Sequence, residues 1–277
     1  MFRGFNLNDF SIESFEEHLT YYEKIGRNLC ATYAVKANKS LAEFALETAT
    51  DVLNATAIKK VWFPIYEDKF DIFISHSHDD EKLAYAIAGY LKETFELNCF
   101  VDSEIWDSAD GLIFKLDQLN EPGTNKFDYN KRNQSTSLIH SLLMMAIMQM
   151  IDNCDCLFFL NTPKSMPFDI AARRLSNSPW IFIEIGISKL IQKKRNKARL
   201  QTYSSSIVEA TIAFDIDTSH LVDLNLDNIL EWEESYKEQK KALEMGQKIC
   251  PSTDRPKAIY PLDVLYNMFP NKEALWS

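Results

Sequence analysis

The sequence predicts an α/β protein in which helices cover both faces of a parallel sheet. Three short apolar runs bounded by polar residues have the length and composition of strands buried on both faces; they are 70–75, 99–101 and 156–160. Segments with helical periodicity separate them along the chain. Because alternating strands and helices build parallel sheets, the carboxyl ends of these strands are expected to meet at one edge. Ligands of such sheets bind beyond that edge.

The composition is that of a globular protein with an acidic surface. The chain has 277 residues and a mass of 32.0 kDa, 46% of its residues are apolar, and its net charge is −10 with a pI near 5.1. The acidic balance argues against a nucleic-acid backbone or an anionic membrane as the main partner. The longest apolar run, 142–148, is far shorter than the ~20 residues that span a bilayer. Five scattered cysteines and an amino terminus without a secretory signal predict a cytoplasmic location.

Residues 1–66 are predicted to form a helical amino-terminal extension without a strand. Two pairs of residues have the spacing of a capping box, which marks a helix start; they are Ser14 with Glu17 and Ser40 with Glu43. The segment carries no catalytic constellation, so it is interpreted either as a docking or oligomerisation element or as a stabilising extension. A polar stretch ends it, and residues 67–245 form the predicted main domain.

Within that domain, Asp79 or Asp80 is expected to cap the helix that follows the first strand. The second strand leads into a polar stretch, 103–137, that is predicted to be an unusually long loop. The helix predicted at 138–151 is apolar nearly all round and should be covered on both sides. Its methionines suit core packing or a protein–protein face.

The carboxyl-terminal half continues the alternation. A helix at 180–191 follows the third strand, and 207–216 is predicted to supply a further strand. The acidic segment 226–243 has the pattern of a surface helix. Residues 246–277 are predicted to wrap the domain as a proline-rich tail that contains a short helix at 262–268.

The most informative residues are Trp180 and Glu184, which lie four positions apart on a predicted helix. Positions i and i+4 share a helix face, so the indole and the carboxylate are expected to point into the same site. An aromatic wall beside a single acid suits the binding and cleavage of a nucleotide-like molecule. Strand ends and the loops after them should supply the remaining contacts. The predicted substrate-binding residues are Ser75, His76, Asp102, Trp106 and Trp180.

The sequence lacks several other common active-site motifs. None of its seven glycines forms a Gly-x-Gly or Walker pattern, which argues against a Rossmann dinucleotide site and a P-loop. No Ser–His–Asp order is set in a nucleophile elbow. His76 and His78 lack the further ligands that a metal requires, so no metal is expected.

Four motifs follow one another in the main domain. They are Phe70-Asp-Ile-Phe-Ile-Ser-His-Ser-His-Asp-Asp80, Phe100-Val-Asp-Ser103, Ile151-Asp-Asn-Cys-Asp-Cys-Leu-Phe-Phe-Leu-Asn161 and Ser178-Pro-Trp-Ile-Phe-Ile-Glu184. In this order they resemble the motifs of Toll/interleukin-1 receptor (TIR) domains, particularly those of bacterial anti-phage systems such as Thoeris. The resemblance covers about residues 68–245. It implies a flavodoxin-like sheet and, as in enzymatic members of the family, cleavage of NAD+ as the substrate with Glu184 in the catalytic position and no cofactor.

The residues suit that reaction. Nicotinamide leaves NAD+ as a neutral molecule and needs no general acid, whereas the ribose develops oxocarbenium-like positive charge. One carboxylate near the ribose hydroxyls stabilises this charge more in the transition state than in the ground state. Attack by water gives ADP-ribose, and attack by a group of the same molecule gives a cyclic product. Bacterial relatives often use such products as signals for a separate effector protein, and self-assembly is expected to complete the site.

Two other classes of function stay open at this point. A non-enzymatic TIR scaffold would act by self-assembly through its faces. A nucleoside-processing enzyme on a similar sheet, such as a deoxyribosyltransferase-like protein, would also place a carboxylate at a ribose but would turn over nucleosides. Release of nicotinamide from NAD+ separates these classes.

Overall fold

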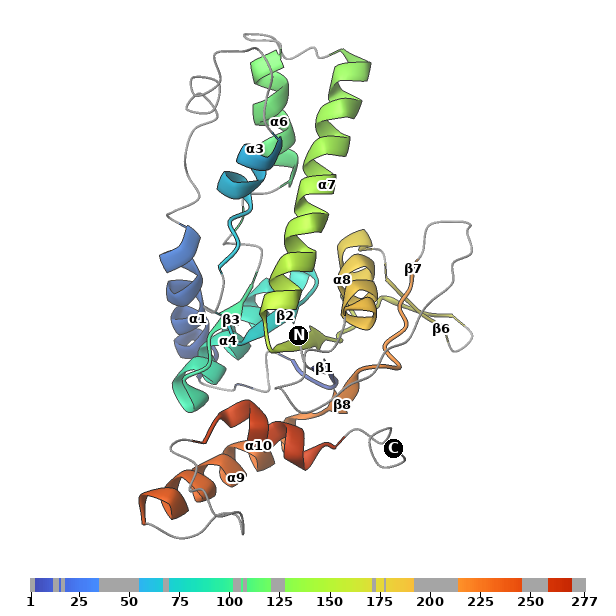
Figure 1. Ribbon diagram of the computed structural model, residues 1–277. Helices are drawn as coiled ribbons and strands as arrows, with labels where there is room; N and C mark the ends of the chain where they lie inside the picture. Colours follow the sequence, from blue (N-terminus) through green and yellow to red (C-terminus); the bar gives the residue numbers. More distant parts are fainter. Residues whose placement is uncertain are drawn as a thin grey trace.

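The computed structural model confirms the α/β fold class, with a five-stranded parallel sheet at its centre (Figure 1). It describes residues 3–11, 15, 18–34, 55–66, 70–101, 106, 109–120, 128–170, 173–176, 178–191, 214–245 and 259–270. The strands are β1 (Arg3–Leu7), β2 (Ile72–Ser75), β3 (Cys99–Phe100), β4 (Cys156–Leu160) and β8 (Val222–Leu224). They lie in the order β3-β2-β4-β1-β8, and helices flank the sheet as in a flavodoxin-like fold.

Three of these strands occupy the predicted apolar runs. Every residue of β2 and β4 is buried, as expected for strands covered on both faces. Ile72 of β2 pairs with Cys99 on one side and with Cys156 on the other, so these three strands share one register. The predicted strands at 70–75, 99–101 and 156–160 are therefore confirmed.

The strand β1 corrects the prediction that residues 1–66 contain no strand. It pairs in parallel with both β4 and β8, where Leu7 lies opposite Leu160 and Leu224. Its buried arginine is paired, because Arg3 donates hydrogen bonds to the carbonyl oxygens of Tyr266 and Phe269. An arginine, a glycine and an asparagine within five residues hide this strand from a search for apolar runs. Residues 3–7 belong to the main sheet.

Most of the remaining described residues of the amino-terminal segment are helical. The helices are α1 (Leu19–Ala34) and α3 (Ala55–Trp62). Both predicted capping boxes lie outside the described residues. Helix α1 approaches α4 (Glu81–Phe95) so closely that only glycine fits at two positions. A Cβ added at Gly26 would lie 2.1 Å from the carbonyl oxygen of Tyr85, and one at Gly89 would lie 1.9 Å from that of Tyr22.

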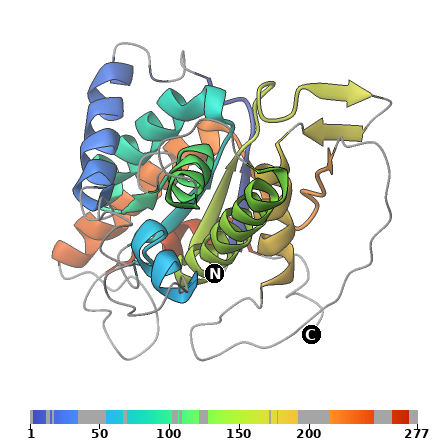
Figure 2. The same cartoon turned by 90° about the horizontal axis from the view of Figure 1, so that it is seen from above.

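The helices form two layers, one on each face of the sheet (Figure 2). Helices α1 and α4 lie on one face, and α7 (Tyr129–Asn153) and α8 (Pro179–Leu190) lie on the other. Right-handed crossovers explain this division, because the chain moves from β2 to β3 in one direction across the sheet and from β4 to β8 in the opposite direction.

A helical hairpin replaces much of the long loop predicted at 103–137. Its helices are α6 (Ala109–Asn120) and α7, which begins at Tyr129 rather than near residue 138. The Asp128 carboxylate caps α7 by accepting hydrogen bonds from the backbone N–H groups of Asn130 (2.9 Å) and Lys131 (3.1 Å). Because this cap lies outside the apolar pattern, the sequence predicts a loop where α7 has its polar first turns.

The prediction that residues 138–151 are covered on both sides is wrong. Met144, Met145 and Met148 are 40%, 49% and 46% exposed, while Ile147 and Met150 of the same helix are buried. Helix α7 therefore presents a methionine-rich stripe, defined as Met144, Met145 and Met148, on the side turned away from the core.

The carboxyl-terminal elements follow the prediction more closely. Helices α9 (Leu226–Glu244) and α10 (Pro261–Met268) match the predicted helices at 226–243 and 262–268. Residues 214–215 of the strand predicted at 207–216 form β7, and the earlier residues lie outside the described part. A second, antiparallel sheet consists of β5 (Phe168–Ile170), β6 (Arg173–Ser176) and β7 (Phe214–Asp215). In the described ranges, no helix has the length and apolarity needed to cross a membrane.

Candidate functional site

The sheet has a topological switch point between the neighbouring strands β2 and β4. The connection that leaves β2 leads to α4 on one face, and the connection that leaves β4 leads toward α8 on the other face (Figure 2). In α/β sheets, ligands bind beyond the carboxyl ends of strands at such a point. Ser75, which is the last residue of β2, lies here and pairs with Phe159 of β4.

A hydrogen bond joins Ser75 to Glu184 at the switch point. The Ser75 hydroxyl donates to Oε2 of Glu184 over 2.6 Å, and the two residues are 1% and 4% exposed. A carboxylate is almost never buried without a specific partner, because removing its charge from water is costly. The structure thus brings together two predicted site residues that are 109 positions apart in the chain.

The start of α8 fixes the position of Glu184. Ser178 is the N-cap, and its hydroxyl accepts a hydrogen bond from the Ile181 N–H group at 3.3 Å. Pro179 follows in the first turn, where its fixed φ suits a helix and its missing N–H group costs nothing. Ile181 and Ile185 anchor the same helix in the core. The Ser-Pro-Trp sequence therefore sets the helix register that directs Glu184 toward β2.

Trp180 lies one turn before Glu184 and forms an aromatic pair with His140 of α7. Their ring centroids are 5.4 Å apart, and the planes meet edge to face at 85°. Trp180 is partly buried, whereas His140 is exposed. His140 is not predictable from the sequence, because nothing in a 25-residue helix shows which turn faces α8.

The other predicted substrate-binding residues lie in different environments. His76 stays next to Ser75, half-buried, with its Nδ1 atom 3.3 Å from the carbonyl oxygen of Ile74. Asp102 lies outside the described residues. Trp106 is 4% exposed, and its Nε1 atom donates to the carbonyl oxygen of Pro64 over 3.3 Å.

The position of Trp106 favours a packing role over its predicted role in substrate binding. Its ring packs edge to face on Phe63 (5.7 Å between centroids) and at 63° on Phe100 (5.0 Å). The indole joins the segment before β2 to the end of β3. Trp106 is therefore a core residue, and the apolar partners that surround it explain why a tryptophan occurs in a polar stretch.

Asp80 occupies the N-cap position of α4, but its side chain makes no capping hydrogen bond. Instead the buried carboxylate accepts a hydrogen bond from the Thr162 hydroxyl and lies 3.3 Å from Nζ of Lys164. Lys164 also donates to the carbonyl oxygen of Asp79 over 2.8 Å. These contacts tie the chain after β2 to the chain after β4, which holds both sides of the switch point together.

A row of polar side chains continues across the sheet from Ser75. Phe159, the partner of Ser75, pairs with Asn6 of β1, and Asn6 pairs with Asp223 of β8. Directly paired residues point to the same face, and adjacent strands are ~4.8 Å apart, so Asn6 lies on the face of Ser75 at a distance of roughly 10 Å. Asn8 extends the row beyond the end of β1.

Hydrogen bonds connect the members of this row, which we call the asparagine row; it comprises Asn6, Asn8, Asn161 and Asp223. Oδ1 of Asp223 accepts from the side-chain amides of Asn6 (2.7 Å) and Asn8 (2.8 Å). Oδ1 of Asn8 accepts from the amide of Asn161 over 3.0 Å. Oδ1 of Asn6 is buried without a hydrogen-bond partner in the described part of the chain. Asn161 follows a predicted strand, so the strand-end rule points to it; the others depend on β1 and β8.

The site is interpreted from its own geometry, since comparison of the chain with protein-family models, curated proteins and solved structures gave no match. In the described ranges, no group of three or more His, Cys, Asp and Glu side chains is arranged to hold a metal ion. What the arrangement offers is one buried carboxylate on a fixed helix, a hydroxyl that orients it, an aromatic pair beside it and amide groups along the same sheet edge.

Proposed function

We propose that the protein is a TIR-type enzyme that cleaves NAD+ and releases nicotinamide, with Glu184 as its catalytic residue. The observation that carries the proposal is the hydrogen bond of 2.6 Å between Ser75 and Glu184. It joins the first and the last of the four motifs that resemble TIR domains, and it does so at the switch point of the sheet, where ligands of such folds bind.

The proposed reaction breaks the bond between C1′ of the ribose and the nicotinamide nitrogen. The bonding electron pair leaves with nicotinamide, which becomes neutral, and positive charge develops on the ribose. Water then forms the new bond to C1′ and loses a proton to solvent, so NAD+ and water give ADP-ribose, nicotinamide and a proton. A nucleophile within the same molecule would give a cyclic ADP-ribose product instead.

Glu184 would stabilise the cationic ribose electrostatically. A carboxylate that is 4% exposed acts in a medium of lower dielectric than water, where its attraction to a developing cation is stronger. Ser75 is proposed as a positioning residue, because its hydroxyl donates to Oε2 and so fixes the orientation of the carboxylate. The aromatic pair of Trp180 and His140 would pack beside the nicotinamide ring. The asparagine row would form hydrogen bonds with hydroxyl groups elsewhere in the substrate.

The biological role follows from the proposed product. An ADP-ribose derivative would act as a signal for a separate effector protein in bacterial anti-phage immunity. Self-assembly is proposed to complete the site, since the exposed methionine-rich stripe of α7 suits subunit contacts.

The proposal is tested by incubating the purified protein with NAD+ and quantifying nicotinamide over a wide range of protein concentrations. We expect nicotinamide release, with an activity per subunit that rises with concentration. Parallel incubations with nucleosides distinguish the related class of nucleoside-processing enzymes. Release of a base from nucleosides, without any reaction of NAD+, would show that the carboxylate at this site acts on nucleosides.

A second candidate function is that of a non-enzymatic scaffold. It is favoured by one observation, the methionine-rich stripe on α7, since exposed methionines suit adaptable protein–protein contacts. A scaffold would change its oligomeric state with concentration, as followed by light scattering, while NAD+ stayed intact in the same samples.

A further inference from the structure

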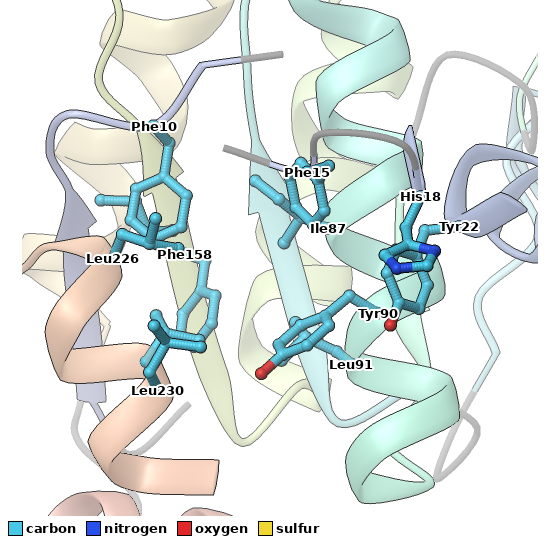
Figure 3. Close-up of a pocket in the computed structure, with 12 residues that line it drawn as sticks. Phe10, Phe15, His18, Tyr22, Ile87, Tyr90, Leu91, Phe158, Leu226 and Leu230 are labelled. Atoms are coloured by element: carbon cyan, nitrogen blue, oxygen red, sulfur yellow. The ribbon is translucent and has the colours of Figure 1, made fainter. Parts of the chain in front are cut away.

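An apolar cavity lies on the face of the sheet opposite Glu184 (Figure 3). Its volume is about 170 Å³. Leu7 of β1 and Phe158 of β4 form its floor, and these residues alternate along their strands with Asn6 and Phe159, which face the other way. The cavity therefore shares two strands with the candidate site but is separated from it by the sheet.

Aromatic side chains form the wall of the cavity along α1 and α4. The rings of Phe15, Tyr22 and Tyr90 contact one another edge to face, with centroid distances of 6.0 Å (Phe15 to Tyr22), 5.5 Å (Tyr22 to Tyr90) and 6.3 Å (Phe15 to Tyr90). Figure 3 shows Phe10 and Leu226 across the gap from this cluster. A flat ring placed between the two walls would meet ring edges and faces, which is the geometry that aromatic groups prefer.

The polar atoms at the cavity are neutral hydroxyls and one imidazole. Among the described residues that line it, none is an aspartate, glutamate, lysine or arginine. The Tyr90 hydroxyl donates to Glu233, and burial, followed by that hydrogen bond, raises the pKa of Tyr90 far above its usual value. Burial likewise raises the pKa of Tyr22. A charged ligand would lose its hydration here without a charged partner, which disfavours its binding.

We propose that this cavity is a binding site for a small neutral aromatic molecule of one ring or two fused rings. Its size supports this, because an engineered apolar protein cavity of about 150 Å³ binds benzene. Its walls supply apolar area and edge-to-face contacts, while the hydroxyl of Tyr22 and the ring of His18 lie at one end to meet a polar substituent (Figure 3). This inference is independent of the proposed NAD+ chemistry.

The test uses indole as the probe on the full-length protein and does not involve NAD+. Thermal unfolding is followed at increasing indole concentrations, and 5-fluoroindole is titrated in parallel by ¹⁹F NMR. We expect a rise in the unfolding midpoint that saturates, since at ten times the dissociation constant the unfolding equilibrium constant falls about 11-fold. The charged analogues indole-3-acetate and tryptamine should bind at least ~10-fold more weakly.

A pair of matched variants locates the binding. Leu230 lines the cavity and is 51% exposed, so Leu230→Trp should narrow the entrance without disturbing the core; Leu190, 58% exposed on α8, provides Leu190→Trp as the control. We expect indole binding to weaken at least tenfold in Leu230→Trp and to persist in Leu190→Trp. Nuclear Overhauser contacts from indole to the rings of Tyr22 and Tyr90 in the unmodified protein give a second readout that needs no variant.

Several outcomes would overturn the inference. One is the absence of any shift of the unfolding midpoint and of any ¹⁹F line broadening up to the solubility limit of indole. Another is an equal loss of indole binding in Leu230→Trp and Leu190→Trp. A third is Overhauser contacts from indole only to residues outside the cavity. Tight binding of both charged analogues would overturn the assignment to neutral ligands.

Discussion

At the scale of single residues, the account depends on the pair formed by Ser75 and Glu184. Replacing Ser75 by alanine removes the hydroxyl that donates to Oε2 and leaves the buried carboxylate less constrained. A hydrogen bond to a charged group contributes about 1.5–3 kcal/mol, so turnover of NAD+ should fall by roughly 10- to 100-fold. We expect the loss in kcat with little change in KM, measured by steady-state nicotinamide release.

A matched substitution separates this effect from a general loss of a buried hydroxyl. Ser135 of α7 is 2% exposed and donates to the carbonyl oxygen of Lys131, away from the switch point. Ser135→Ala should leave kcat unchanged. Equal losses in the two variants would show that Ser75 has no special role in orienting Glu184.

The sequence predicted part of this site because helix and strand periodicities are local. The spacing of Trp180 and Glu184 placed both on one helix, and the strand-end rule placed Ser75 beside them. The contacts of His140 and of the asparagine row are not predictable from local pattern, because they depend on which elements become neighbours in the fold. The side-chain direction of Trp106 is not predictable for the same reason, since an aromatic residue in a loop packs on the nearest apolar surface.

At the scale of structural elements, Trp106 is expected to stabilise the fold rather than to bind substrate. Trp106→Ala would leave a cavity between Phe63 and Phe100, which costs about 3–5 kcal/mol of the free energy of unfolding. Trp106→Phe keeps most of the packing and loses the hydrogen bond to Pro64, at about 1 kcal/mol. Denaturant unfolding measures both, and KM for NAD+ should not change. If Trp106→Ala left the free energy of unfolding unchanged and raised KM for NAD+, Trp106 would be a substrate-binding residue after all.

The start of β4 supplies a prediction about pH. Burial raises the pKa of Asp155 above its usual value of 3.8, and the hydrogen bond from Tyr266 opposes this effect only in part. The folded protein therefore holds this proton more tightly than the unfolded chain does. The stabilisation is fully present below pH 3.8 and is lost as the pH rises through the folded-state pKa.

Asparagine at position 155 keeps an oxygen for Tyr266 but does not ionise. The free energy of unfolding of Asp155→Asn, relative to the unmodified protein, should therefore increase from about pH 4 to about pH 8. Urea unfolding at several pH values gives this difference. Parallel pH curves for the two proteins would mean that the Asp155 proton is bound equally in the folded and unfolded states.

The elements predicted best were those with a continuous apolar signal, such as β2 and β4. Helix α6 and the first turns of α7 lie in a polar stretch, where the helix is stabilised by packing of the hairpin and by the Asp128 cap rather than by a visible apolar period. Tertiary contacts of this kind override a reading of the sequence that relies on local pattern.

At the scale of the whole molecule, β1 makes the amino terminus part of the core. Phe5 and Leu7 are 0% and 1% exposed, and burying each contributes about 1.5–3 kcal/mol before the backbone hydrogen bonds to β4 and β8 are counted. Total stabilities are only about 5–15 kcal/mol. Removal of residues 1–66 should therefore abolish cooperative unfolding, as measured by circular dichroism during heating. A folded 67–277 fragment with a sharp transition would contradict the central position of β1.

The order of the strands is the part of the fold that the sequence did not specify. The strand β1 lies between β4 and β8, and nothing in the residues Arg3–Leu7 predicts pairing with strands so distant in the sequence. The two-layer arrangement was predictable, because strand–helix alternation and right-handed crossovers leave few alternatives.

The central claim is that Glu184 is the carboxylate that cleaves NAD+, and its most direct test compares nicotinamide release by the unmodified protein with release by Glu184→Gln. Glutamine keeps the shape of the side chain and removes the charge, so turnover should fall at least ~10²-fold while the thermal midpoint stays similar. Glu96→Gln, at a position whose side chain is 79% exposed, serves as the control and should keep full activity. Undiminished nicotinamide release by a folded Glu184→Gln protein would contradict the account.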